Sequence, residues 1–333
     1  MTTPVLPSPR GDLSSGLLAS LTAGPPGPAA LPLPVPDPGA DPWDEDLHLA
    51  LYVCYELHYR GFTGVDPGWE WAPPLLSLRG ALERRFLDAL RAEALVQPLD
   101  TLLEGLLTEP RTGNGPSHRL LATGTRQQAG EYLAHRSLYH LKEADPQLWV
   151  VPRLTGAPRA AVMAVQFDEY GAGHPERAHA RLFGEMMADF GLDPTYGHYV
   201  DAAAGPAFAV VNLMSMFGLH RALRGALIGQ FAAVEIGSPP GAARLAAAFE
   251  RLGAGPAGTL FYREHVEADA VHEQVVRHQV IAPMVEAEPE LAADIAFGIA
   301  ASTLTETRFA RLLTEAWDSG ASSLHGGALT AGR

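Results

Sequence analysis

Cysteine is almost absent from this chain. Cys54 is the only cysteine among the 333 residues. An intramolecular disulfide is therefore impossible, and a metal cluster held by several thiolates is excluded. This composition fits a reducing compartment, and it means that any metal bound by the chain must take nitrogen and oxygen ligands.

The sequence also lacks long hydrophobic runs and an excess of basic residues. No apolar run reaches the length of about 18 residues that a membrane-spanning helix needs. Acidic residues number 38 against 24 lysines and arginines, and a net charge of −14 would repel a phosphate backbone. The N-terminus has no basic start or apolar core typical of a secretory signal. We therefore expect a cytoplasmic protein with neither nucleic acid nor a membrane as its partner.

Strand-like alternation of apolar and polar residues is nearly absent, whereas helical periodicity is common. The pattern DEDLHLALYVCYELHYR, for example, repeats apolar residues at spacings of three and four. Such periodicity over most of the chain predicts an all-α bundle. The predicted helical segments are residues 44–60, 74–107, 119–146, 157–170, 175–190, 198–218, 220–236, 240–253, 258–285 and 289–318.

Composition divides the chain into four predicted parts. Residues 1–42 are rich in proline, glycine and alanine, which predicts a disordered arm. Residues 43–110 are predicted to form auxiliary helices, with Pro98 at a joint between two of them. Residues 111–319 form the main helical domain, and residues 320–333 are predicted to be a disordered tail.

The segment FYREHVEADAVHEQVVRH carries the most informative pattern. His265, Asp269 and His272 stand at positions i, i+4 and i+7, so their side chains fall within one narrow stripe of a helix. Two imidazoles and a carboxylate that face the same way can bind one site. In the absence of thiolates, these ligand types favour iron or manganese.

Further candidate ligands occur upstream. Glu169 and His179 are ten residues apart, but the glycines and Pro175 between them allow a bend that would bring the two side chains together. Glu176 is a rival for Glu169, because Glu176 and His179 have the Glu-x-x-His spacing of ferritin-like bundles. We rank Glu176 second, since an acidic residue after Pro175 is also favoured at the first turn of a helix. Glu143, near the end of a helical pattern, is a weaker candidate by itself.

The order Glu143, Glu169, His179 and then His265-x-x-x-Asp269-x-x-His272 resembles the haem-oxygenase-like diiron oxidases and oxygenases, also called iron-containing redox enzymes. The resemblance covers roughly residues 119–318. It implies a haem-oxygenase-like helical bundle, preceded here by extra N-terminal helices. It also implies that these six residues hold two iron ions.

The resemblance implies chemistry with dioxygen as co-substrate. Three carboxylates and three imidazoles cannot saturate two octahedral irons unless carboxylates bridge, so positions stay open for dioxygen and a small organic substrate. Family members carry out N-oxygenation of amines or oxidative C–C cleavage. An external reductase and a homodimer formed through the N-terminal helices are the partners that we consider.

Two other functions compete with this interpretation. A haem-binding protein of the same fold would use one axial histidine and a glycine-rich helix, for which GALIG at residues 225–229 is a weak match. A helical scaffold that binds a small molecule without turnover is the non-enzymatic alternative. A thiaminase-type hydrolase is disfavoured, because Cys54 lies outside the motif region.

Overall fold

The computed structural model of the chain describes residues 3–27, 30–37, 39–108, 113–327 and 329, except for the side chains of residues 269 and 270. Helices joined by turns build this part of the chain, and it contains no β-strand. The predicted all-α bundle with additional N-terminal helices is thus confirmed. None of the described helices is both long and apolar enough to cross a membrane.

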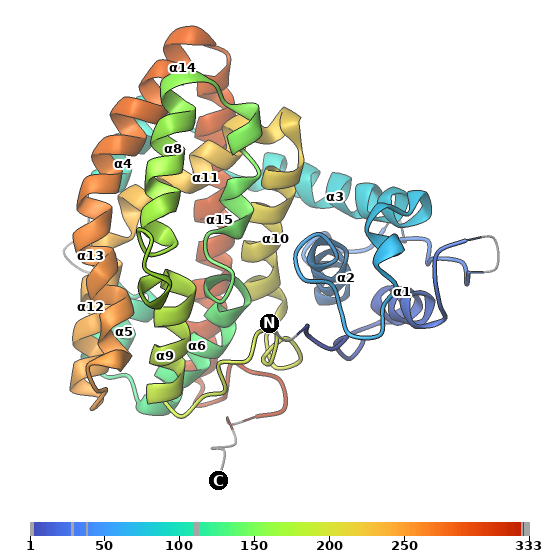
Figure 1. Cartoon of the computed structure of the whole chain (residues 1–333). Coiled ribbons are helices and arrows are strands. Elements are labelled where there is room, and N and C mark those ends of the chain that lie inside the picture. The colour runs from blue at the N-terminus through green and yellow to red at the C-terminus, as the bar shows by residue number, and fades with distance from the viewer. Residues whose placement is uncertain (1–2, 28–29, 38, 109–112, 328, 330–333) are drawn as a thin grey trace.

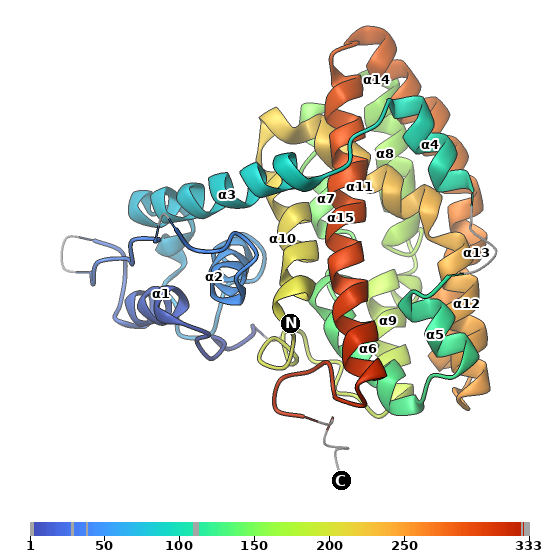
Figure 2. The ribbon, with the colours of Figure 1, turned by 180° about the vertical axis from the view of Figure 1, so that it is seen from behind.

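Fifteen α-helices follow one another in the described residues, with short 3-10 turns and one π-helical segment between them (Figures 1 and 2). They are α1 (Asp12–Thr22), α2 (Glu45–Glu56), α3 (Pro73–Glu93), α4 (Leu99–Leu107), α5 (Pro116–Ala122), α6 (Arg126–His140), α7 (Asp145–Leu148), α8 (Gly156–Glu169), α9 (His179–Asp189), α10 (Gly205–Leu219), α11 (Arg224–Gly237), α12 (Pro239–Arg251), α13 (Ala257–Val275), α14 (Ala282–Ala287) and α15 (Leu291–Asp318). The π-helical segment, η5 (Val276–Ile281), continues α13.

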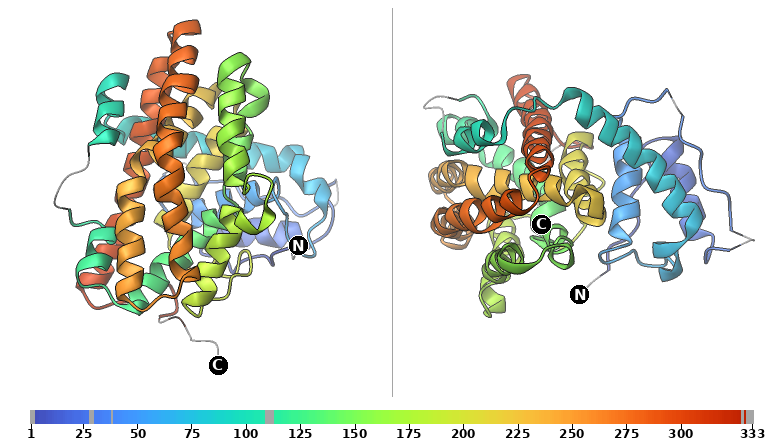
Figure 3. Two further views of the ribbon diagram at one scale, coloured as in Figure 1. Left: turned by 60° about the vertical axis from the view of Figure 1, so that its left-hand side comes forward. Right: turned by 90° about the horizontal axis from the view of Figure 1, so that it is seen from above.

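The core of the bundle forms around α10 and α11, most of whose residues are buried, and the buried face of α15. Helix α13 packs against α9, α11 and α12, and α8 packs against η5 (Figure 1). Viewed along the bundle, helices α1, α2 and α3 form a separate layer beside α10, whereas α4 packs against α11 and α15 (Figure 3). The helices α8, α9, α11 and α13 therefore surround a common interior.

Two glycines allow α11 and α15 to cross at very short range. A Cβ atom added to Gly229 would collide with the carbonyl oxygen of Ile295, and one added to Gly298 would collide with that of Ala226. At Gly225 an added Cβ would strike the side chain of Asp294. Close packing between two core helices thus explains the glycines of the GALIG segment.

Part of the predicted N-terminal arm is folded, which corrects the assignment of residues 1–42 to a disordered segment. Helix α1 buries Leu17 and Leu21 against α2. Its first turn is capped by the Asp46 carboxylate of α2, which accepts hydrogen bonds from the N–H groups of Leu13 and Ser14 at 2.8 Å each. The stabilising contacts come from a distant helix and leave no local signal in a proline-rich sequence.

The beginning of the predicted C-terminal tail is likewise packed. Ser323 and Leu324 are buried, and Glu131 of α6 accepts hydrogen bonds from the Ser323 N–H at 3.0 Å and hydroxyl at 2.9 Å. Residues 320–324 are therefore anchored to the bundle, contrary to the prediction. Residues 328 and 330–333 lie outside the described residues.

Helix boundaries near residue 143 also differ from the prediction. The predicted segment 119–146 is divided into α5, α6 and α7, because Thr125 starts a new helix with a capping box to Gln128. Helix α6 ends at His140, so Glu143 lies in the turn before α7. The predicted joint at Pro98 is confirmed, since α3 ends at Glu93 and α4 begins at Leu99.

The crossing of α11 and α15 can be tested by the substitution Gly229→Ala. The added methyl group meets backbone that cannot rotate away, so we expect the free energy of unfolding to fall by about 1–3 kcal/mol. Gly105→Ala in α4 is the matched control, because nothing lies within 4 Å of an added Cβ there. Thermal unfolding should show a lower midpoint for the first variant and an unchanged or higher one for the second. Equal midpoints for the two variants would contradict this packing.

Candidate metal centre

A sharp reversal of the chain brings Glu169 and His179 together. Glu169 is the last residue of α8 and His179 is the first of α9. Gly171 and Gly173 adopt φ angles of 88° and 86°, which other residues rarely accept. As a result, Glu169 Oε2 lies 2.7 Å from His179 Nδ1, and the predicted bend is confirmed.

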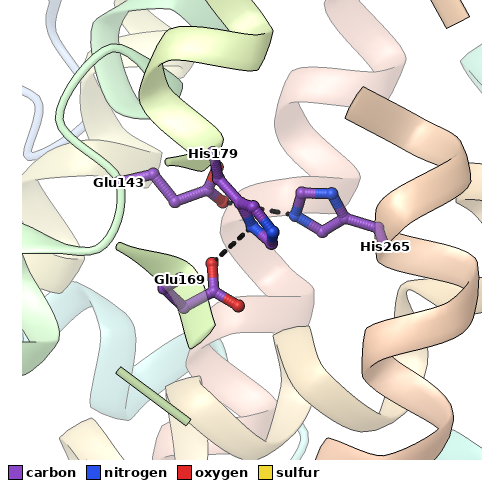
Figure 4. Close-up of side chains that lie close together, drawn as sticks. All are labelled: Glu143, Glu169, His179 and His265. Carbon is purple, nitrogen blue, oxygen red and sulfur yellow. Dashed lines mark ion pairs between the residues drawn. The ribbon is translucent and has the colours of Figure 1, made fainter. Parts of the chain in front are cut away.

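Glu143 approaches this pair from the turn after α6. Its side chain is 4% exposed, and its Oε1 lies 3.1 Å from His140 Nδ1 and 3.8 Å from His265 Nε2. Potential ligand atoms of Glu143, Glu169, His179 and His265 all lie within 4.8 Å of one another (Figure 4). These residues come from the turn before α7 and from α8, α9 and α13, and we call them the first donor group.

A second donor group adjoins the first and shares Glu169 with it. Potential ligand atoms of Glu169, Glu235 and His272 also lie within 4.8 Å of one another, and all three residues are buried. His272 Nδ1 is 2.9 Å from Glu235 Oε2 and 3.7 Å from Glu169 Oε1. Two adjacent groups with one carboxylate in common form the arrangement that a pair of metal ions needs.

The structure thus brings five of the six predicted ligands together. Asp269 belongs to α13, between His265 and His272, but its side chain lies outside the described residues. The rival Glu176 is exposed and pairs with His174 instead, at 3.3 Å. Spacing left the choice between Glu169 and Glu176 open, and both burial and the reversal between α8 and α9 favour Glu169.

Glu235 was not predicted from the sequence. It lies on α11, in the run GALIGQFAAVEIG, and is the only acidic residue of that helix. A carboxylate within such an apolar run could have marked it as a candidate, because a buried charge needs a partner. No spacing relates it to the other ligands, since its position depends on how α11 packs against α13.

Hydrogen bonds fix which nitrogen of each α13 histidine faces the centre. His265 Nδ1 donates to the carbonyl oxygen of Phe261 at 2.7 Å, which leaves Nε2 directed toward Glu143. In His272 the Nδ1 atom faces the second donor group, while Nε2 lies 3.3 Å from Asp168 Oδ2. Carbonyl and carboxylate acceptors of this kind orient histidines at metal sites. Asp168 is therefore a further residue of the centre that sequence reasoning missed.

Neighbouring charges and burial determine the protonation states of Glu143 and Tyr139 at the centre. Burial alone would raise the pKa of the Glu143 carboxyl, but His140 and His265 outweigh burial and hold that pKa well below its ordinary value. Burial, followed by the charges of Glu143, Glu169 and Glu235, raises the pKa of the Tyr139 phenol far above its ordinary value. Glu143 is thus an anion, and Tyr139 keeps its proton.

The donor set fits iron. Its oxygen and nitrogen atoms are buried and close together. Burial of several carboxylates at one place is energetically unfavourable unless a cation neutralises their charge. Among the side chains that the structure describes, none forms a hydrogen bond with the buried Oε2 atom of Glu143, as expected for an atom that would bind a metal. Mixed carboxylate and imidazole ligands without thiolate suit non-haem iron or manganese.

Comparisons with known proteins agree with this donor chemistry. Residues 130–306, more than half of the chain, match a family described as iron-containing redox enzymes. Nitrosourea synthase from Streptomyces achromogenes subsp. streptozoticus is 24% identical over 218 residues, which cover 63% of this chain and 46% of that enzyme. The chain therefore spans about half the length of this curated relative.

A solved structure is also similar in part. It is a crystal structure of a domain of unknown function with a haem-oxygenase-like fold from Shewanella denitrificans OS217. The match covers 70% of this chain and 93% of that chain, with 17% sequence identity and a TM-score of 0.45.

Removal of the shared carboxylate should weaken iron binding at both donor groups. We expect Glu169→Ala to bind little iron at either donor group, whereas Glu235→Ala should lose mainly the iron bound at the second. Iron per chain, measured by mass spectrometry after anaerobic Fe(II) loading, checks this. Glu176→Ala is the matched control and should keep the wild-type content. A Glu169→Ala variant with full iron content would refute the assignment of this residue.

Proposed function

Because this chain belongs to the family of iron-containing redox enzymes, we propose that it is a non-haem diiron oxidase or oxygenase that uses dioxygen to oxidise a small organic molecule. The observation that supports this most directly is the position of Glu169 in two adjacent donor groups. A single-iron enzyme would not need both groups. Together with Asp269, the two groups would supply four carboxylates and three imidazoles for two ions.

The protein's own residues would orient the ligands and keep water away. The Phe261 carbonyl and the Asp168 carboxylate hold the ring planes of His265 and His272. The buried walls of the bundle lower the local dielectric constant, so that charges inside interact strongly. When bound, the two ferrous ions would supply the electrons and the open coordination positions that dioxygen activation requires.

Tyr139 would hold a proton beside the carboxylates. Its hydroxyl lies 3.5 Å from Gln147 Oε1, and Gln147 Nε2 donates to Gln230 Oε1 at 3.1 Å. This chain of neutral groups lies next to the anionic ligands and carries no charge of its own. The positive charge of bound metal ions would then be balanced by Glu143, Glu169 and Glu235, the carboxylates whose charges raise the pKa of the phenol.

The comparison with a curated relative narrows the proposed chemistry further than the fold does. The name of the nitrosourea synthase relative favours oxidation of nitrogen over oxidative C–C cleavage. Because the chain corresponds to less than half of that enzyme, a substrate screen should include candidates for both reactions. Restoring the ferrous state after turnover would require an external reductase, and the proposed homodimer would form through the N-terminal helices.

Oxygen uptake tests the proposed function. Protein loaded anaerobically with two equivalents of Fe(II) should consume dioxygen on mixing, and a productive amine or acid should accelerate that consumption. An oxygen electrode and product mass spectrometry measure the two effects. His265→Ala should consume no more dioxygen than free Fe(II), because one ligand of the first donor group is gone.

The same experiment separates the alternatives. A scaffold or a small-molecule binder would consume no more dioxygen than free Fe(II) at any iron load, and no candidate substrate would accelerate the consumption. A haem protein would show a Soret band after incubation with haem and would gain nothing from Fe(II). Either result with the wild-type protein would contradict the proposed function.

A further inference from the structure

Lys142 stands out in the composition and in the fold. It is the only lysine of the sequence, since every other member of the 24 lysine and arginine residues is an arginine. Its side chain is 1% exposed, and it directly precedes Glu143 of the first donor group. A lone ammonium group that is buried beside a metal ligand requires an explanation, because burial of a charge is strongly unfavourable.

The partner of Lys142 comes from the auxiliary N-terminal helices. Its Nζ lies 3.0 Å from Oε2 of Glu56, the last residue of α2, which is fully buried. The ammonium group also lies over the rings of Tyr59 and Tyr52, at 4.2 Å and 5.1 Å from their centroids. These contacts give Glu56 a packing and hydrogen-bonding role inside the protein.

Glu56 is itself held in place. The Tyr196 hydroxyl, from the segment between α9 and α10, lies 2.8 Å from Oε1 and 2.7 Å from Oε2 of Glu56. Arg60 stacks on the Tyr196 ring at 3.7 Å, and its Nη2 donates to the carbonyl oxygen of Leu141 at 3.1 Å. We call Glu56, Arg60, Lys142 and Tyr196 the clamp.

The clamp fixes the two residues that precede Glu143, and other contacts fix those that follow it. The Tyr170 hydroxyl donates to Asp145 at 2.5 Å, and Gln147 bonds to Gln230. The turn is thus held on both sides, while Oε2 of Glu143 has no hydrogen-bond partner within the described part of the chain. These contacts hold the backbone around Glu143 rigidly, and they leave its Oε2 atom available to bind a metal ion.

We infer that the clamp is a positioning device that joins the auxiliary helices to the metal centre by fixing Glu143 for the ion of the first donor group. Glu56 and Arg60 lie outside residues 130–306, so a ligand within the family region is placed by residues that precede it. A purely stabilising role explains the pair poorly, because desolvation of two buried charges offsets most of their attraction. The inference rests on the proposed diiron function.

The variants Glu56→Gln and Lys142→Met test the clamp. Each should weaken Fe(II) binding at the first donor group about 10- to 100-fold, as removal of supporting residues does at other metal sites. Binding at the second donor group should be unchanged. Anaerobic competition with a coloured Fe(II) chelator measures the two affinities. The visible spectrum of the Co(II)-loaded protein should change for one of the two ions.

A double variant separates positioning from stability. Glu56→Gln combined with Lys142→Met removes both charges, so its thermal midpoint should return toward the wild-type value. Its affinity at the first donor group should nevertheless stay low, because Glu143 is no longer fixed. If stability and affinity recover together, the clamp has only a structural role and the inference is wrong.

Glu83→Gln is the matched control. Glu83 is another buried carboxylate of the N-terminal helices and bonds to Tyr55, Arg79 and His220, away from the metal centre. The Glu83→Gln substitution should lower the thermal midpoint and leave the Fe(II) affinities of both donor groups unchanged. If the single clamp variants do not fold, the double variant and Arg60→Ala, in a half-buried position, are measured instead.

The outcomes distinguish this inference from the proposed function. Wild-type protein that binds fewer than two Fe(II) ions would refute the proposed function itself. Wild-type protein that binds two, together with folded clamp variants that bind both ions with wild-type affinity, would refute only the clamp.

Discussion

The candidate metal centre depends on a single shared carboxylate. Glu169 is within reach of His179 in the first donor group and of His272 in the second, because α8 ends where its side chain enters the interior. That position requires the tight reversal through Gly171 and Gly173, where an added Cβ at Gly171 would collide with the backbone of His174 and Ala178. The chemistry of the site thus rests on a turn that only glycine accepts without strain.

The bundle supports this centre at several distances. The hydrogen bonds of His265 and His272 orient the ligands directly, through Phe261 and Asp168. Farther out, the buried pair of Glu56 and Lys142 connects the first helices of the chain to the turn of Glu143. The close crossing of α11 and α15 at Gly229 then sets the position of the helix that carries Glu235. Each of these sets of contacts limits the movement of the residues closer to the centre, as preorganised sites require.

Local patterns in the sequence predicted much of this arrangement. The stripe formed by His265 and His272 follows from helical periodicity alone, and the reversal between Glu169 and His179 follows from Gly171 and Gly173. The described helices agree with most of the predicted segments because apolar periodicity is strong in a well-packed bundle. The order of the ligands along the chain then indicated the family that the comparison over residues 130–306 establishes.

Features that depend on distant contacts escaped prediction. Glu235 has no spacing relation to the other ligands and reaches them only because α11 packs against α13. Helix α1 depends on a cap from Asp46, and the segment around Ser323 depends on Glu131. Composition alone favoured disorder in both segments, since it contains no information about partners elsewhere in the chain.

Anomalous diffraction at the iron edge would test the central claim most directly. Crystals of the protein loaded anaerobically with Fe(II) should contain two iron peaks about 3.5–4 Å apart, with the Glu169 carboxylate between them. One peak bound to the first donor group, or iron bound away from Glu169, would contradict the account.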